Sequence, residues 1–212
     1  IVSSGLQTMQ RTLSEDSRML LEKYGNSEGF ATAFNPSIQI VCANNIQRAF
    51  IGTAPTISLL KRTFTEEQVN TWIIIQLEDL NMFAGTKNKI EPNQSLMLCD
   101  IIKTDYYYLK ASELLLFFYQ FKTGKYGQLY GSVDPLRITF ALNEFVLYRR
   151  NMLIQYEREA EKERREKEEQ ERLRTAITRE EYLILKRRKQ RVFIAKKRKL
   201  GKFKLFKDKI DG

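Results

Sequence analysis

Hydrophobic residues in the middle of the chain recur at spacings of three and four, which is typical of helices with one buried face. This pattern predicts helices over about 66–84, 92–104 and 111–122. The first of them carries a single apolar stripe, as expected of a core helix, made of Val69, Trp72, Ile73, Gln76, Leu77, Leu80 and Phe83. The other two present Leu96, Leu98, Ile101 and Ile102, and Leu114, Leu115, Phe117, Phe118 and Phe121.

Residues with known preferences for helix ends mark where helices begin and stop. Thr65 is followed three residues later by Gln68, which is the reciprocal capping pattern of a helix start. Gly85 is placed to end that helix, because glycine readily adopts the left-handed conformation of a C-cap. Asp134 and Pro135 predict another start, with an acceptor side chain at the cap and then a residue that needs no N–H donor.

The first 54 residues give weaker signals. Apolar and charged residues over about 13–24 predict a short amphipathic helix that ends near Gly25. From 26 to 53, glycine, proline and asparagine interrupt brief apolar pieces, and we expect mostly loop there. Residues 1–54 are therefore interpreted as a poorly defined N-terminal segment with one short helix.

The helix that begins after Asp134 is long and changes character along its length. Its early apolar positions should hold it against the body, but beyond Tyr156 apolar residues almost vanish, and 157–174 contain eight acids and seven bases. Without sustained apolar heptad positions this segment does not fit a coiled coil. Ion pairs worth about 0.3–0.5 kcal/mol each would support it alone, so 156–178 is interpreted as a solvated spacer helix. The pairs expected are Glu161 with Arg165, Glu163 with Lys167 and Glu168 with Arg172.

A second capping pattern, from Thr178 to Glu181, predicts a break near 175–178 and a last helix that ends at Gly201. Residues 202–207 alternate cations with apolar side chains and are expected to be unordered when free. The predicted fold class is all-α. A small helical bundle over 55–155 is followed by the long charged helix and by a basic C-terminal arm over 179–212.

The net charge of +10 comes from the C-terminal end of the chain. Residues 1–134 carry 12 basic and 13 acidic residues, whereas 186–212 alone carry 13 basic residues and two acidic ones. So dense a run favours a polyanionic partner, because neutralising phosphates releases their counterions. Aromatic residues lie between the cations, as in proteins that stack single-stranded bases. The candidate nucleic-acid-binding residues are Lys186, Arg187, Arg188, Lys189, Arg191, Lys196, Lys197, Arg198, Lys199, Lys202, Lys204, Phe203 and Phe206.

Other interpretations of the basic run stay open. It could bind an anionic membrane surface or an acidic protein partner, or it could serve only to keep the chain in solution. Phe193, which also lies among the cations, could simply pack on a neighbouring helix.

Glycines and tyrosines cluster over 124–132, near Lys122 and Lys125. Such a loop could approach a phosphate, but it lacks the spacing of a phosphate-binding loop. We interpret it as a tight connection between helices, packed by Tyr126 and Tyr130.

Two further groups have simple structural interpretations. The consecutive tyrosines at 106–108 are interpreted as the edge of the core rather than as a base-stacking surface. Cys42 and Cys99, the only cysteines, are interpreted as small buried side chains with no assigned role.

The composition excludes several kinds of chemistry. Histidine is absent, which removes the usual zinc spacings and the histidine-based catalytic arrangements. We therefore expect a protein that is not an enzyme and that binds no metal and no cofactor. No apolar stretch approaches the roughly 18 residues that a membrane span needs. The sequence starts at Ile1 rather than Met, so we do not expect Ile1 to be the natural first residue.

The residues around the last helices of the body occur in a distinctive order. They run Leu109-Lys110-Ala111-Ser112-Glu113-Leu114 to Phe117-Phe118, then Phe121-Lys122, Gly124, Tyr126-Gly127, Tyr130-Gly131, Asp134, Phe145 and Arg149. This order resembles an uncharacterised family of small proteins encoded by phages and mobile elements of gut bacteria. With Trp72 and Leu80 upstream, the resemblance covers about 55–155 and leaves out the N-terminus and the tail. It implies an accessory protein of phage or mobile-element DNA replication, in the cytoplasm of a bacterial host cell.

The sequence therefore predicts a non-enzymatic adaptor. Its body would bind a protein partner, and its arm would hold DNA or RNA without sequence preference. The architecture is loosely similar to that of helicase loaders, without their nucleotide-binding loop. One alternative is a phage structural or scaffold protein that assembles through its charged helix, and another is a protein that binds anionic membranes or acidic proteins.

Overall fold

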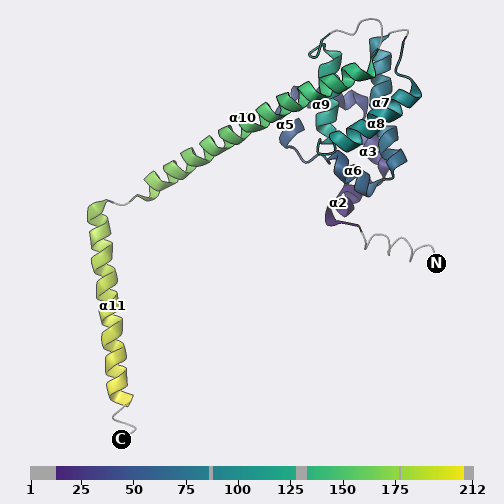
Figure 1. Cartoon of the computed structure of the whole chain (residues 1–212). Helices are drawn as coiled ribbons and strands as arrows, with labels where there is room; N and C mark the ends of the chain where they lie inside the picture. The colour runs from purple at the N-terminus through teal and green to yellow at the C-terminus, as the bar shows by residue number, and fades with distance from the viewer. Residues whose placement is uncertain (1–12, 86–87, 128–132, 177, 208–212) are drawn as a thin grey trace, which may run out of the picture. The chain divides into compact units, whose positions relative to one another are not determined.

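The computed structural model describes residues 13–85, 88–127, 133–176 and 178–207, the last ten of these by their backbone. The predicted all-α class is confirmed, and no strand occurs within these ranges. The chain divides into two units, residues 1–157 and 158–212. The elements in Figure 1 are α2 (Glu15–Tyr24), α3 (Ser27–Ala33), the 3-10 turn η1 (Pro36–Ile38), α4 (Gln39–Asn44), α5 (Ile46–Ile51), α6 (Ile57–Thr63), α7 (Glu66–Ala84), α8 (Pro92–Asp105), α9 (Ala111–Lys122), α10 (Pro135–Thr175) and α11 (Arg179–Lys207).

Local capping sets the helix ends as predicted. At the start of α7 the Thr65 hydroxyl accepts the Gln68 backbone N–H at 3.3 Å, and the Gln68 side chain accepts the Thr65 N–H at 3.0 Å. Gly85 ends this helix in the left-handed conformation, with φ of 58°. At the start of α10 the Asp134 carboxylate accepts the Leu136 N–H at 2.9 Å. The predicted helices over 66–84, 92–104 and 111–122 are confirmed.

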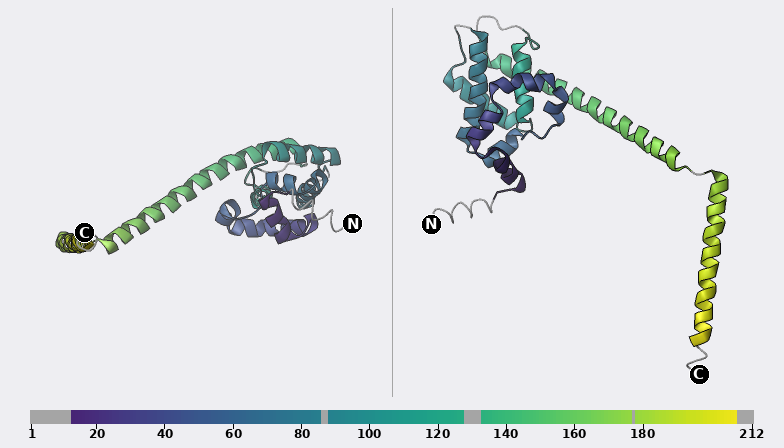
Figure 2. Two further views of the ribbon diagram at one scale, coloured as in Figure 1. Left: turned by 90° about the horizontal axis from the view of Figure 1, so that it is seen from below. Right: turned by 180° about the vertical axis from the view of Figure 1, so that it is seen from behind.

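The central element of the body is α9, which is apolar around nearly its whole circumference. All of residues 111–118 are buried. It contacts α4, α5 and α7, and the Phe117 ring lies 5.7 Å from that of Phe145 on α10. In Figure 2 the purple N-terminal helices lie along one side of the body and the green start of α10 along the opposite side. A helix that is apolar all round must be covered on every face, and these elements form its cover.

The prediction of mostly loop over 26–53 was wrong. These residues form α3, η1, α4 and α5, none longer than seven residues. The side chains of Asn26, Asn35 and Asn45 accept backbone N–H groups and cap three of these elements. Helices this short are marginal in isolation, so they depend on buried anchors such as Phe30 and Phe50. Their asparagines are helix caps rather than signs of irregular structure.

A short extended pairing joins the start of α6 to the start of α9. The Ala111 N–H donates to the Pro55 carbonyl oxygen, and the Ile57 N–H donates to the Leu109 carbonyl oxygen, both at 2.8 Å. These bonds fix the segment before each helix in one register. The entry of the chain into the buried helix is thereby tied to a segment more than fifty residues earlier.

Lys110 and Glu113 form a polar centre at the start of α9. The Lys110 ammonium donates to the carbonyl oxygens of Phe50 and Gly52, both at 2.7 Å. The fully buried Glu113 carboxylate accepts the Lys110 backbone N–H at 2.8 Å and the Arg149 Nε–H at 2.7 Å. Burial raises the pKa of Glu113, and the hydrogen bond from Lys110 and the charge of Arg149 oppose that rise only in part. One buried carboxyl therefore joins α9 to α10.

Two predicted core residues face solvent instead. Phe83 is 60% exposed, because the last turn of α7 buries Leu80 and Asn81. The Asn81 Oδ1 accepts the Ile90 N–H at 3.1 Å, which ties α7 to the segment before α8. Leu96 is 45% exposed. The buried face of α8 follows Ser95, Leu98, Cys99 and Ile102, which places position 96 outside it.

We expect the stabilising contribution of Glu113 to fall as the pH rises. Because its pKa is raised on folding, the folded state binds this proton more tightly than the unfolded chain does. The stabilisation from protonated Glu113 is fully present below the unfolded-state pKa of about 4.3, and it is lost as the pH rises through the folded-state pKa. Each pKa unit between the two states corresponds to about 1.4 kcal/mol of this stabilisation. The free energy of unfolding of the wild type, minus that of Glu113→Gln, should decrease between about pH 4 and pH 8 in urea titrations followed by circular dichroism.

Glu144→Gln serves as the control, because Glu144 is an exposed acid on α10. The corresponding difference for this variant should show no such fall. A difference for Glu113→Gln that stays constant or grows with pH would contradict the interpretation.

We expect both thiols to be protected in the native state. Cys99 is fully buried, and burial raises its pKa to about 12, while Cys42 is 8% exposed with a raised pKa. Thiolate, the reactive form, is therefore scarce at both sites near pH 8. An aromatic disulfide reagent should label both within minutes in denaturant, and in native protein Cys42 before Cys99. The variants Cys42→Ser and Cys99→Ser assign the two phases, and native Cys99 reacting as fast as a free thiol would disprove the prediction.

Candidate nucleic-acid interface

The basic arm is a helix that begins at the predicted place and extends further than predicted. Ahead of α11, the Thr178 hydroxyl accepts the Glu181 N–H at 3.2 Å, and the Glu181 carboxylate accepts the Thr178 N–H at 2.8 Å. The helix continues through Gly201 to Lys207. The predicted end at Gly201 and the predicted unordered segment 202–207 were therefore wrong. A single glycine costs a helix only about 1 kcal/mol relative to alanine, and its neighbours are mostly good helix formers.

The candidate cations of α11 whose side chains are described are exposed and unpaired. Within the ranges that the structure covers, none of them forms an ion pair or a side-chain hydrogen bond. They are Lys186, Arg187, Arg188, Lys189, Arg191, Lys196 and Lys197. Six further candidates have side chains that lie outside the described residues: Arg198, Lys199, Lys202, Phe203, Lys204 and Phe206.

The cations lie in groups of four consecutive residues. An α-helix turns once in 3.6 residues, so positions 186–189 point around a complete turn and form a band rather than a face. The sequence repeats this arrangement ten residues later at 196–199, about 15 Å further along the axis. Apolar groups of four, 182–185 and 192–195, precede the two basic groups. Phosphate-binding capacity is therefore offered on all sides of the helix.

The apolar residues between the basic groups are also exposed. Phe193 is 68% exposed and Tyr182 is 53% exposed. Within its own unit Phe193 therefore does not pack on another described helix, and packing on a helix elsewhere stays an open alternative. Exposed aromatic rings beside cations are suited to base stacking.

Four cations in the charged part of α10 differ from those of α11 because they form ion pairs. Lys162, Arg164, Arg165 and Lys167 each lie within 4 Å of a glutamate four residues away on the same helix. The predicted pairs Glu161–Arg165 and Glu163–Lys167 are confirmed at 2.6 and 3.9 Å. Glu168 pairs with Arg164 rather than with Arg172. These cations are balanced locally and have little charge left for a partner.

Two cations of the body, Lys103 and Lys122, are likewise paired. Lys103, only 3% exposed, lies 2.6 Å from Glu66 and 2.9 Å from Asp100. Lys122 pairs with Asp79. These positions hold helices together, so they are poor candidates for phosphate contact.

The loop after α9 has the predicted structural role. Tyr126 is buried, and its hydroxyl donates to the Gln120 Oε1 at 2.6 Å. The Lys125 ammonium lies 3.2 Å from the centre of the Tyr148 ring, and burial lowers its pKa. Gly127 has φ of 95°, and a side chain there would collide with Arg137. Tyr130 lies outside the described residues.

The three consecutive tyrosines divide between core and surface. Tyr106 is buried and donates to the Asn143 Oδ1 at 2.8 Å, and Tyr108 is partly buried. Tyr107 is 51% exposed. The interpretation as the core edge therefore holds for the first and third residues and not for the second.

Residues 90–192 match the model of a family of unknown function, DUF6633. No curated protein and no solved structure matches the chain. The DUF6633 match begins just before α8 and ends at Val192 on α11. It thus includes the charged part of α10 and the first basic group of the arm. The match overlaps the predicted extent of the resemblance, 55–155, over residues 90–155 and continues into the arm.

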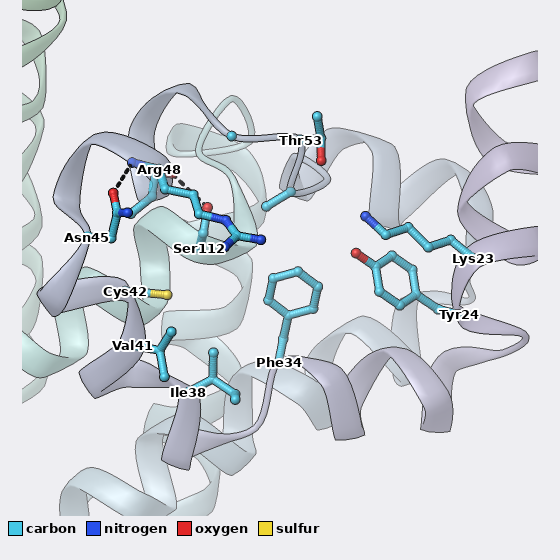
Figure 3. Close-up of a pocket in the computed structure, with 13 residues that line it drawn as sticks. Lys23, Tyr24, Phe34, Ile38, Val41, Cys42, Asn45, Arg48, Thr53 and Ser112 are labelled. Atoms are coloured by element: carbon cyan, nitrogen blue, oxygen red, sulfur yellow. Dashed lines mark hydrogen bonds between the residues drawn. The ribbon is translucent and has the colours of Figure 1, made fainter.

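The described residues contain no group of three or more potential metal ligands, and none of their helices is long and apolar enough to cross a membrane. The structure does bring together two cations that the sequence pattern did not single out. Lys23 and Arg48 line one pocket of the body (Figure 3). They lie on different helices, and no motif connects them in the sequence.

Proposed function

We propose that the protein is a non-enzymatic adaptor whose basic arm binds DNA or RNA without sequence preference. The observation that carries the proposal is the band at 186–189, in which four consecutive cations are exposed, unpaired and directed around a full turn of α11. Unpaired cations gain most from phosphate contact, because they have no ion pair to give up and they release counterions from the nucleic acid. The paired cations of α10 lack this advantage.

The arrangement favours a nucleic acid over a membrane surface. A helix that lies on a membrane needs one apolar face and one basic face. In α11 the basic and apolar residues alternate along the axis in groups of four, so each side of the helix carries both kinds. A nucleic-acid strand can follow cations around a helix, whereas a planar membrane meets only one side of it.

The body's part in the proposed adaptor is contact with a protein partner. The first turns of α10 expose Leu136, Phe140 and Leu147, at spacings of four and seven residues. Exposed large apolar side chains of this kind are common at protein contacts. The charged part of α10 then acts as a spacer between the partner-binding body and the arm.

We also propose that the protein serves phage or mobile-element DNA replication, as the sequence resemblance implies. The match of residues 90–192 to one family supports a common unit that includes the first basic group. The genes encoded beside it test this proposal. Replication genes would support it, and capsid genes would replace it with a structural role.

Removing the charges of the first basic band should weaken nucleic-acid binding. We expect the quadruple variant Lys186→Gln, Arg187→Gln, Arg188→Gln, Lys189→Gln to lose about a hundredfold or more in affinity at low salt. The magnitude of the slope of log affinity against log salt should decrease by about 3 to 4. Each lost phosphate contact lowers it by roughly 0.7 on single strands and roughly 0.9 on duplex DNA. Fluorescence anisotropy with labelled single-stranded and duplex oligonucleotides measures both quantities.

The matched control removes the same number of charges from α10, with Lys162, Arg164, Arg165 and Lys167 changed to Gln. This variant should retain most of its affinity, because those cations are already paired. Equal losses in the two variants would show that only net charge matters, against the proposal. Tighter binding of the wild type to anionic vesicles than to oligonucleotides would also contradict it.

A further inference from the structure

A pocket of about 260 Å³ opens in the body among the N-terminal helices. Its lining comes from the end of α2, the C-cap of α3, α4, α5, residues 52–54 and the first turn of α9. Figure 3 shows the side chains of Arg48, Phe34, Tyr24 and Lys23 pointing toward a common centre. All of these elements belong to the body, so the pocket does not involve the arm.

Several polar groups of the pocket are donors without hydrogen-bond partners, whereas the Ser112 hydroxyl donates to the Ala49 carbonyl oxygen at 2.7 Å. Within the described part of the chain, the Arg48 guanidinium and the Lys23 ammonium have no ion pair or hydrogen bond, and the Tyr24 hydroxyl has no hydrogen bond. The Asn45 side chain uses its oxygen to accept the Arg48 backbone N–H at 2.9 Å, which leaves its amide N–H groups free. No acidic residue is among the described residues that line the pocket. Unpaired donors around an uncompensated positive charge select an anionic ligand.

The rest of the lining is apolar and aromatic. Ile38, Val41 and Cys42 form one wall, and the Phe34 ring lies between the two cations. That ring packs against two aromatic neighbours, with centroid distances of 4.9 Å to Phe30 and 5.7 Å to Tyr24. A small inorganic anion would leave this apolar surface unused, whereas an anion with a planar ring would cover it.

We infer that this pocket binds a nucleoside phosphate, with the phosphate between Lys23 and Arg48 and the base against Phe34. The inference is independent of the arm, because it uses none of the residues of α11. Two cations and a hydroxyl match the charge and the acceptors of a phosphate group. Aromatic side chains beside cations are how proteins commonly hold a base next to its phosphate.

A second cavity continues the site. It has a volume of about 460 Å³ and shares Lys23, Tyr24 and residues 52–54 with the first pocket. Its additional lining includes Arg62 and one acid, Asp16. A ligand longer than one nucleotide can therefore extend from the pocket into this cavity. Two sources of the same chemistry fit the site, a free nucleotide and a unit of a single strand.

The test uses the full-length chain with Lys186, Arg187, Arg188 and Lys189 changed to Gln, so that the first basic band of the arm does not contribute. Isothermal titration calorimetry with a nucleoside monophosphate should detect binding, and inorganic phosphate should bind at least about tenfold more weakly, because it cannot cover the apolar wall. Arg48→Gln in this background should lower the affinity for the monophosphate about tenfold, through loss of a charge-assisted hydrogen bond. Tyr24→Phe should lower it several-fold and leave the unfolding temperature unchanged, since its hydroxyl has no protein partner.

Arg150→Gln is the matched control, because Arg150 is an exposed cation of the body that lines neither cavity. It should leave the affinity unchanged. A tetranucleotide that binds more tightly than the monophosphate, with the gain lost in Arg48→Gln, would identify a single strand as the source, and equal binding would identify the free nucleotide. Absence of binding by both ligands, or equal affinities of the parent and Arg48→Gln proteins, would overturn the inference. Absence of monophosphate binding, together with oligonucleotide binding by the protein with an unaltered arm, would overturn this inference and leave the proposed function standing.

Discussion

The structure depends on one constraint, which is that α9 has no polar face. Its first eight residues are all buried, and leaving any one of the large side chains in water would cost about 1.5–3 kcal/mol. The helices that contact α9 therefore serve largely to bury its side chains. This constraint explains how elements of six or seven residues, too short to be stable alone, become part of an ordered body.

Burying the start of such a helix leaves backbone groups that need partners, and the chain meets this need with charged side chains. The Glu113 carboxylate accepts the Lys110 backbone N–H, and the Lys110 ammonium donates to carbonyl oxygens at the end of α5. Burying a charged carboxylate costs free energy unless a cation compensates for the lost hydration. Arg149 compensates for the burial of Glu113 only in part, because the pKa of Glu113 is still raised. The benefit of these charged side chains is positional, because the hydrogen bonds of Lys110 and Glu113 hold α5, α9 and α10 in place relative to one another.

Charged side chains have two different roles along the chain. In the body and along α10, cations such as Lys103 and Arg165 are matched to carboxylates within the same unit. The described candidate cations of α11 form no such pairs, so their positive charge is available to an external anion. In the pocket beside Phe34, Lys23 and Arg48 are also unmatched, and no acid is among the described lining residues. Both surfaces that we propose for ligands therefore carry cations without a carboxylate partner.

The sequence by itself determined the features that depend on neighbouring residues. Capping pairs such as Thr65 with Gln68, and Thr178 with Glu181, set helix starts through bonds three residues apart, so the all-α class and the main helix bounds could be predicted. The basic arm could be found because its cations are adjacent in the chain. Only the tertiary structure decided what joins distant residues. The short helices α4 and α5 form because they pack on α9, and α3 packs on α2 and α7. Lys23 and Arg48 line one pocket because the body brings α2 and α5 to it, and no local sequence pattern predicts this.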